Sequence, residues 1–517
     1  MFGKALVLKL LKNWLVLVAT LFVVSIPLVH YSQAIFSNKN TQTLKVAYPH
    51  QWVTPLHPSS QHTLVEDAIM LNVFESLVQR GGNGLVLPLA AKSFTFSKDF
   101  KTLNFQINTQ KKFSNGDQLS SQDFKKSWEE AFSNTPNSSN SSLADIIIEI
   151  EGSEDFAKTG QLSGVKTPTP ETLTISFKRP FRMALMHLTG ARFAAFKKIN
   201  DNYLGTGLFK FKTQSNNYIV LSKNDYSTET SEFSSIEAIH REDAQEALAN
   251  GDIDIIAING QVHEENENIG HSYGEENVGA WLHLNGKDGR FFAESKYRKA
   301  FQYLVWKALQ NKKDELESKL GHFRLDFQPY LPFSLGRIEN SEAEEIISQG
   351  KQYVEELIAE SKKNPIKVCF IGNVKDFLFD TLTEQGLTLE DLKIPPTGMM
   401  EDYYKNHRAD ILVSVASVHL SDPDGLYHLL GKNGAIHSPM IYREKVSQLL
   451  EDGRSLTDQD AIAEHYQNLS RTIFEEVPGV HIGYRYSNYL YRKDRLNIES
   501  TVLDRHYDIL WKIFKAK

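Results

Sequence analysis

Strand-like and helix-like patterns alternate along almost the whole chain, and this alternation is the feature that most constrains the fold. Residues 43–48 alternate between polar and apolar side chains as a strand does, and helical spacing of apolar residues follows over 64–78. The alternation of strand and helix patterns continues along the chain. Strands are predicted near residues 103–107, 173–177, 208–211, 218–221, 366–371 and 411–418, and helices near 120–132, 296–312 and 341–361. The pattern predicts the α/β class, with mixed α+β elements.

The length predicts more than one folded unit. The chain has 517 residues, whereas a single hydrophobic core stops growing at about 250–300 residues. The net charge is −7, and the lack of a basic excess argues against a nucleic-acid partner. The one cysteine, Cys369, lies in an apolar run. We expect it to be a buried small hydrophobic residue without a disulfide partner in this chain.

The first 34 residues have the three parts of a secretory signal. Three lysines precede an uncharged run from Trp14 to Val29, and Ser32-Gln33-Ala34 supplies the small-residue end. The run is shorter than the about 20 residues of a spanning helix. We therefore predict a signal peptide at 1–34 and a periplasmic protein; an uncleaved membrane anchor is the alternative.

Seven short motifs occur in order between residues 73 and 423. They are Val73-Phe74-Glu75-Ser76-Leu77-Val78, Pro88-Leu89-Ala90-Ala91-Lys92-Ser93, Phe113-Ser114-Asn115-Gly116-Asp117, Gly205-Thr206-Gly207-Leu208-Phe209-Lys210, Gly251-Asp252-Ile253-Asp254, Arg298-Lys299-Ala300 and Asp422-Pro423. Each is common alone, but the ordered set resembles family 5 of the extracellular solute-binding proteins, the oligopeptide- and dipeptide-binding type.

The resemblance implies a two-lobed periplasmic-binding-protein fold, with a hinge and an extra subdomain inserted in the first lobe. Ligand would lie in the cleft between the lobes, which close by a hinge motion. The implied division is lobe I at 43–84, 191–269 and 481–517, the inserted subdomain at 85–190, and lobe II at 270–480.

The resemblance also implies a function. The protein would be the substrate-binding component of an ABC importer and would deliver peptides or peptide-like compounds to permease subunits in the inner membrane. It would be a monomer and would need no cofactor. Three alternatives stay open: a non-peptide ligand such as a metal chelate, haem or a glycoside, an envelope hydrolase, or a chaperone-like role. The chain has no G-x-S-x-G, H-E-x-x-H or P-loop motif. The polar stretch 263–271 is interpreted as a solvated acidic loop without a metal.

One departure from the family pattern bears on the ligand. In the peptide-binding relatives, an Asp three residues before "D-P" pairs with the peptide's α-amino group, and here His419 has that position. A neutral imidazole accepts a hydrogen bond from an amine, whereas an imidazolium repels it and attracts a carboxylate. We therefore expect His419, Asp422 and Asp424 to contact the ligand. Three possibilities stay open: an amine-blocked ligand, an anionic ligand, or a ligand whose amine is anchored by another residue such as Asp422 or Asp424. The alternative is that His419 only caps the strand end.

Four further residues are candidate ligand contacts by the same resemblance. Gln51 and Trp52 lie in the segment that lines the cleft in relatives, and Trp52 offers a flat apolar platform. A packed surface aromatic is an equally good interpretation of Trp52. Trp281 and Tyr484 lie near the expected crossings between the lobes, where packing is the favoured interpretation of both.

Overall fold

The computed structural model describes residues 42–48, 51–52, 54–58, 64–81, 85–134, 146–200, 202–257, 266–320, 323–370, 375–394, 402–417, 422–432, 434, 437–498 and 509–517. The predicted signal peptide and His419 lie outside these residues. Within them, no helix combines the length and the apolar character that crossing a membrane requires.

One long sheet of eleven strands runs through both halves of the molecule. Its first half consists of β10 (Phe209–Ser215), β11 (Tyr218–Lys223), β12 (Phe233–His240), β1 (Gln42–Tyr48) and β13 (Ile255–Ala257). Its second half consists of β18 (Ile411–Ser417), β16 (Ile366–Phe370) and β17 (Leu389–Asp391). The short strand β15 (Phe323–Leu325) lies off this order and pairs with β19 (Gly479–Arg492). We call these halves lobe I and lobe II.

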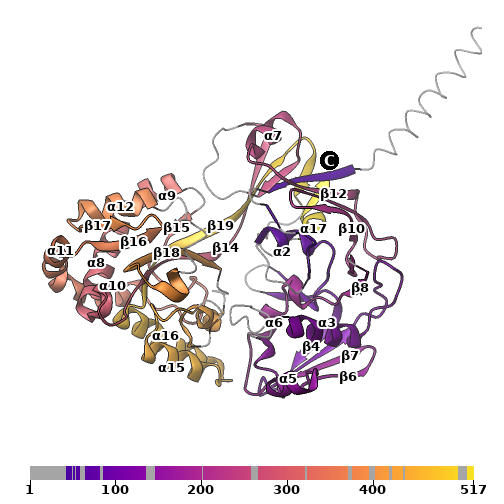
Figure 1. Ribbon diagram of the computed structural model, residues 1–517, viewed down its shortest axis with the longest axis horizontal. Helices are drawn as coiled ribbons and strands as arrows, with labels where there is room; N and C mark the ends of the chain where they lie inside the picture. Colours follow the sequence, from indigo (N-terminus) through magenta and orange to yellow (C-terminus); the bar gives the residue numbers. More distant parts are fainter. Residues whose placement is uncertain are drawn as a thin grey trace, which may run out of the picture.

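Two long antiparallel strands join the lobes. β14 (Ile269–Leu284) pairs with β19 (Gly479–Arg492) along most of its length. Near residue 490 β19 also pairs with β13 of lobe I, and over 278–284 β14 pairs with β18 of lobe II. Figure 1 shows β14 and β19 passing between the two bodies. The predicted two-lobed α/β fold is confirmed, and the bounds of the two lobes stay a prediction.

A third body packs below lobe I. Its four-stranded sheet has the order β4 (Ala91–Phe96), β5 (Thr102–Ile107), β7 (Thr172–Ser176) and β6 (Val165–Thr169), and α3 (Ser121–Asn134) packs on it. Ser120 and Asp123 close the start of α3, where the Ser120 amide donates to Asp123 Oδ2 at 2.8 Å. A separate apolar core with Phe124 and Trp128 fills this body. The separate core supports the predicted insertion at 85–190, whose bounds stay a prediction.

Helices cover the two faces of the lobe II sheet. They are α8 (Ser295–Asn311), α10 (Asn340–Ser348), α11 (Val354–Lys363), α15 (Glu444–Gly453) and α16 (Gln459–Glu476). One apolar core packs around Phe301 of α8 and another around Tyr466 of α16. The sheet therefore has a buried face on each side: Val368 of β16 packs in one core and Cys369 in the other.

Two predicted helices differ from the structure. The helix expected over 64–78 ends at Met70, and α2 spans Leu64–Met70. The Asn72 side chain donates to the Ala68 carbonyl at 2.8 Å and closes the helix end. The helix expected over 341–361 is broken at 349–353 by a 3-10 turn. There, a Cβ on Gly350 would lie 2.1 Å from the Lys299 carbonyl oxygen, so close packing on α8 decides the break.

Shorter elements complete the fold. They are β2 (Val78–Arg80), β3 (Val86–Pro88), α5 (Phe156–Thr159), α6 (Ala184–His187), β8 (Lys197–Ile199), β9 (Asn202–Leu204), α7 (Ala244–Asn250), α9 (Lys313–Leu320), α12 (Lys375–Glu384), α14 (Tyr427–Leu430), β20 (Leu496–Ile498), α17 (Leu510–Ile513) and β21 (Phe514–Ala516).

Candidate ligand cleft

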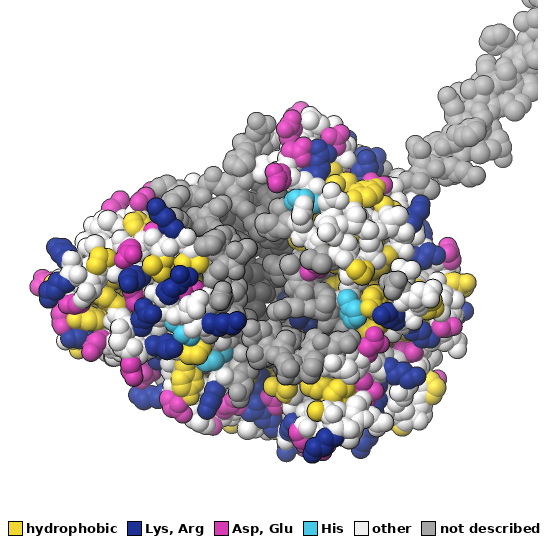
Figure 2. All heavy atoms as spheres, viewed as in Figure 1, with side chains coloured by type: hydrophobic (Ala, Val, Ile, Leu, Met, Phe, Trp, Pro, Cys, Tyr) yellow, Lys and Arg dark blue, Asp and Glu magenta, His cyan; other side chains and the backbone are white. Residues whose placement is uncertain are grey.

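The inserted subdomain meets lobe II along a boundary that we call the furrow, and side chains of the two bodies pair across it. Figure 2 shows one face of the molecule with both bodies. On the subdomain side, the segment after β7 carries Arg179, which forms a two-bond pair with Glu149. Arg179 Nε donates to Glu149 Oε2 at 2.9 Å and Nη2 donates to Oε1 at 2.6 Å. Arg179 also donates to Glu451 of α15 in lobe II. This arginine therefore ties the subdomain to the opposite lobe.

On the lobe II side, a short 3-10 turn over Pro423–Leu426 leads into α14. Asp422 caps this turn, because its Oδ1 accepts from the Asp424 amide at 2.9 Å. The proline at the first position of the turn has no N–H to satisfy, so it fits there. The cap explains locally why the Asp422-Pro423 motif begins the turn and fixes the direction of the Asp422 side chain.

Arg454 is the centre of a buried charge network between the lobes. Its Nε lies 3.0 Å from Asp424 Oδ2, and its Nη1 lies 3.0 Å from Glu149 Oε1 of the subdomain. Its guanidinium stacks 3.5 Å from the Tyr427 ring centroid. Because Arg454, Asp424 and Glu149 are all buried, each charge depends on its partners for the hydration that it lost.

Asp424 is fully engaged in this network. Besides Arg454, Tyr466 donates its hydroxyl to Asp424 Oδ1 at 3.2 Å. Burial raises the pKa of Asp424, and the charge of Arg454 opposes that rise. The predicted role of Asp424 as an amine anchor is not tested by this geometry. The carboxylate already has an arginine and a tyrosine as partners.

A second contact between the lobes joins two histidines. The Nε2 atoms of His187 in α6 and His428 in α14 lie 3.2 Å apart, and the rings meet edge to face. Burial holds the pKa of His187 well below its usual range, and His428 and Arg454 add to the effect. A neutral His187 can share one proton with His428, so one ring donates and the other accepts.

The predicted contact residues fall into three places. Asp422 and Asp424 come together at the furrow, and His419 precedes them outside the described residues. Trp281 and Tyr484 are both buried around His481, with ring centroids 5.0 and 4.6 Å from it. These two therefore lie inside lobe II, as the packing interpretation expects.

Gln51 and Trp52 lie in lobe I. Gln51 is exposed, and Trp52 is only 2% exposed. The Trp52 indole donates to the Ser215 carbonyl at 2.7 Å, and its ring packs against Tyr48. This position fits the packing alternative better than a platform for ligand, since almost none of the ring reaches solvent.

Sequence reasoning missed the residues that join the lobes. They are Glu149, Arg179, His187, His428, Glu451 and Arg454. One signal was present: Glu149 interrupts the apolar run 146–150, and a lone acid in such a run predicts a buried, paired carboxylate. Its partners depend on tertiary contacts: Arg179 is 30 residues and Arg454 is 305 residues away in the sequence.

Comparisons with known proteins agree with this architecture. Residues 86–308 match the model of the bacterial extracellular solute-binding proteins, family 5. The oligopeptide-binding protein OppA of Bacillus subtilis is 30% identical over 190 residues, which are 33% of this chain and 34% of the relative. The predicted resemblance to family 5 is confirmed. The match covers about a third of the relative's length.

Solved structures share the fold of this family over most of the chain. An oligopeptide-binding protein from Borrelia burgdorferi is 17% identical with a TM-score of 0.74, covering 92% of this chain and 100% of that one. The murein tripeptide binding protein MppA of Escherichia coli is 15% identical with a TM-score of 0.74, covering 92% and 99%. AgaA, solved in complex with agropinic acid, is 17% identical with a TM-score of 0.72, covering 92% and 99%. The family-5 fold therefore extends across both lobes and the subdomain.

Proposed function

We propose that this chain is the substrate-binding component of an ABC importer, exported to the periplasm, which captures peptides or peptide-like compounds between its lobes. The observation that carries the proposal is the furrow between two lobes that are joined by β14 and β19. Two connected bodies that enclose a ligand exclude water from it, as interface pockets do. The family match and the relative that binds oligopeptides support this class of ligand.

Asp422 is the carboxylate that we propose as the partner of a ligand amine. One of its oxygens caps the turn, and the other carries no hydrogen bond among the described residues. Loss of hydration raises the pKa of Asp422, and the charge of Arg182 opposes that rise. An ammonium group would complete the coordination of this acid through a charge-assisted bond.

Arg182 lies opposite, on the subdomain side of the furrow. It is half-buried, and its charge acts on both Asp422 and Asp424, but no ion pair joins it to either acid within the described part of the chain. A guanidinium in this position suits the carboxylate of a peptide-like ligand. The furrow would then offer one anion and one cation to a zwitterion.

The test measures the affinity of short peptides for the wild type and for Asp422→Asn by isothermal titration calorimetry. Asparagine keeps the acceptor that caps the turn and removes the charge. We expect free peptides to lose affinity roughly ten- to hundredfold, the worth of a charge-assisted bond of about 1.5–3 kcal/mol. Amine-blocked peptides should bind both proteins equally.

Asp458→Asn is the matched control. Asp458 caps α16 in the same way, by accepting from the Ala461 amide at 2.9 Å, but it lies outside the furrow. Equal losses in both variants would show a general effect on stability and would exclude Asp422 as the anchor. If no peptide binds but a metal chelate, haem or a glycoside does, the non-peptide alternative replaces the proposal. Cleavage of the peptide would favour the hydrolase alternative.

A further inference from the structure

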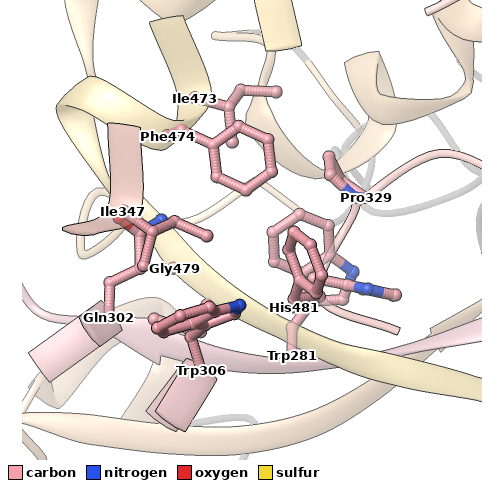
Figure 3. Close-up of a pocket in the computed structure, with 11 residues that line it drawn as sticks. Trp281, Gln302, Trp306, Pro329, Ile347, Ile473, Phe474, Gly479 and His481 are labelled. Atoms are coloured by element: carbon pink, nitrogen blue, oxygen red, sulfur yellow. The ribbon is translucent and has the colours of Figure 1, made fainter. Parts of the chain in front are cut away.

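A cavity inside lobe II has unsatisfied ring nitrogens in its wall. It is lined by Trp281, Gln302, Trp306 and His481 among apolar side chains, and Figure 3 shows the two tryptophans and His481 around it. The space that the centre of a water molecule can occupy there is about 10 Å³, close to what one water needs. The cavity therefore has room for about one water molecule.

Trp281 Nε1 and His481 Nε2 are buried and have no hydrogen-bond partner in the described part of the chain. Trp281 is 1% and His481 is 3% exposed. Buried polar groups without partners are uncommon in folded proteins, and each costs free energy. A molecule bound between these two nitrogens would remove that cost.

The two nitrogens have opposite hydrogen-bonding roles. His481 Nδ1 lies 2.8 Å from the Asp326 carbonyl oxygen and must donate to it. Burial lowers the pKa of His481 to about 4, so at neutral pH the ring is uncharged and Nε2 is an acceptor. The Trp281 indole is a donor only. A group that accepts one hydrogen bond and donates another, namely a hydroxyl, matches this pair.

The nitrogens also converge. A Cβ built on Gly279 would lie 3.0 Å from His481 Nε2 and 3.1 Å from Trp281 Nε1. The two nitrogens are therefore no more than about 6 Å apart, a separation that one water molecule with two hydrogen bonds of about 3 Å can bridge. The site lies where the pairing of β14 with β19 shifts register between Ala280 and Trp281, at the lobe II end of the strands that connect the lobes.

We propose that lobe II holds a buried hydroxyl-bearing molecule, which the cavity volume identifies as water, hydrogen-bonded between Trp281 Nε1 and His481 Nε2. The water accepts from the indole and donates to the imidazole. It completes the hydrogen bonding of two rings that stand on β14 and β19, and it is separate from any ligand in the furrow.

The test counts waters of long residence by magnetic relaxation dispersion in wild type and Trp281→Phe. We expect the variant to lose one such water, because it lacks the donor. Trp511→Phe is the control: its indole nitrogen is also buried without a partner in the described residues, but it does not line this cavity. Equal counts in wild type and Trp281→Phe would overturn the proposal.

A high-resolution crystal structure of the wild-type chain tests the same site if Trp281→Phe does not fold. A single density peak about 3 Å from both nitrogens supports water. A cavity without density, or density that avoids the nitrogens, contradicts a hydroxyl site.

Discussion

Two histidines are buried in the paired strands of lobe II. His283 on β14 and His481 on β19 are 2% and 3% exposed. Burial lowers the pKa of His283 to about 3 and that of His481 to about 4, from an ordinary value of 6.5. The folded protein therefore keeps both rings neutral in a pH range where the unfolded chain protonates them.

This difference predicts acid sensitivity. Above pH 6.5 the two histidines are neutral in both the folded and the unfolded state, so their contribution to stability is fully present. As the pH falls from 6.5 towards 3, the unfolded state binds protons on these rings and the folded state does not, so stability is lost. At pH 5 each histidine should lower the free energy of unfolding by roughly 2 kcal/mol relative to pH 7. In His283→Gln, the loss of unfolding free energy between pH 7 and pH 5, measured in urea, should be smaller by about this amount.

His271→Gln supplies the comparison, since His271 is exposed on the same strand. It should keep the pH dependence of the wild type. If His283→Gln and wild type lose the same free energy between pH 7 and pH 5, His283 is protonated in the folded state at pH 5.

At the residue scale, sequence reasoning reached the motif residues but not their partners. The Asp422-Pro423 motif identified the acid at the furrow, because a capped turn has a local signature. The pair of Asp424 with Arg454, by contrast, joins segments 30 residues apart, and that of Arg454 with Glu149 joins segments 305 residues apart. No local pattern encodes such contacts.

At the element scale, the Gly205-Thr206-Gly207 turn locks lobe I to the segment after α2. A Cβ on Gly205 would lie 2.1 Å from the Val73 carbonyl oxygen. The Gly207 amide donates to the same carbonyl at 2.9 Å. The glycines are therefore required by the close approach of two backbones.

Gly205→Ala should destabilise the protein by more than about 2 kcal/mol, because a methyl group overlaps backbone that cannot move aside cheaply. The midpoint of urea unfolding measures this. Gly160→Ala is the control: Gly160 has a φ of +65° and no atom near its Cβ position. That change should cost only the left-handed penalty of about 1–2 kcal/mol. Equal costs at the two sites would contradict the close approach.

The element predictions succeeded where the pattern was local. The strand patterns near 103–107, 173–177 and 411–418 correspond to β5, β7 and β18, because alternation or continuous apolar runs report the burial of each face. Helical spacing over 64–78 was misleading. Phe74, Leu77 and Val78 are buried, but they enter the core from a turn and a strand.

At the scale of the whole molecule, the buried network around Arg454 holds the subdomain against lobe II. Without Arg454, the buried Asp424 would lose its only ion pair among the described residues and keep the Tyr466 hydroxyl, while Glu149 would keep Arg179. Removing one partner of a buried pair costs about 3–5 kcal/mol, and parting the lobes lets water relieve that cost.

Arg454→Gln should therefore shift the protein without ligand towards an open arrangement, with a larger radius of gyration in X-ray scattering. Arg241→Gln, which removes an exposed pair with Asp243 in lobe I, should leave the radius unchanged. An unchanged radius in Arg454→Gln would mean that other contacts keep the lobes together.

The most direct test of the account is the distance between the subdomain and lobe II with and without ligand. Lys158 of α5 and Lys445 of α15 are exposed, with side chains 83% and 74% accessible, and Figure 1 shows α5 and α15 on opposite sides of the furrow. Spin labels on cysteines at these positions report the distance by pulsed dipolar spectroscopy. The native Cys369 is buried. Saturating peptide should narrow the distribution and favour the short distance; a distribution that stays the same while peptide binds would contradict capture between the lobes.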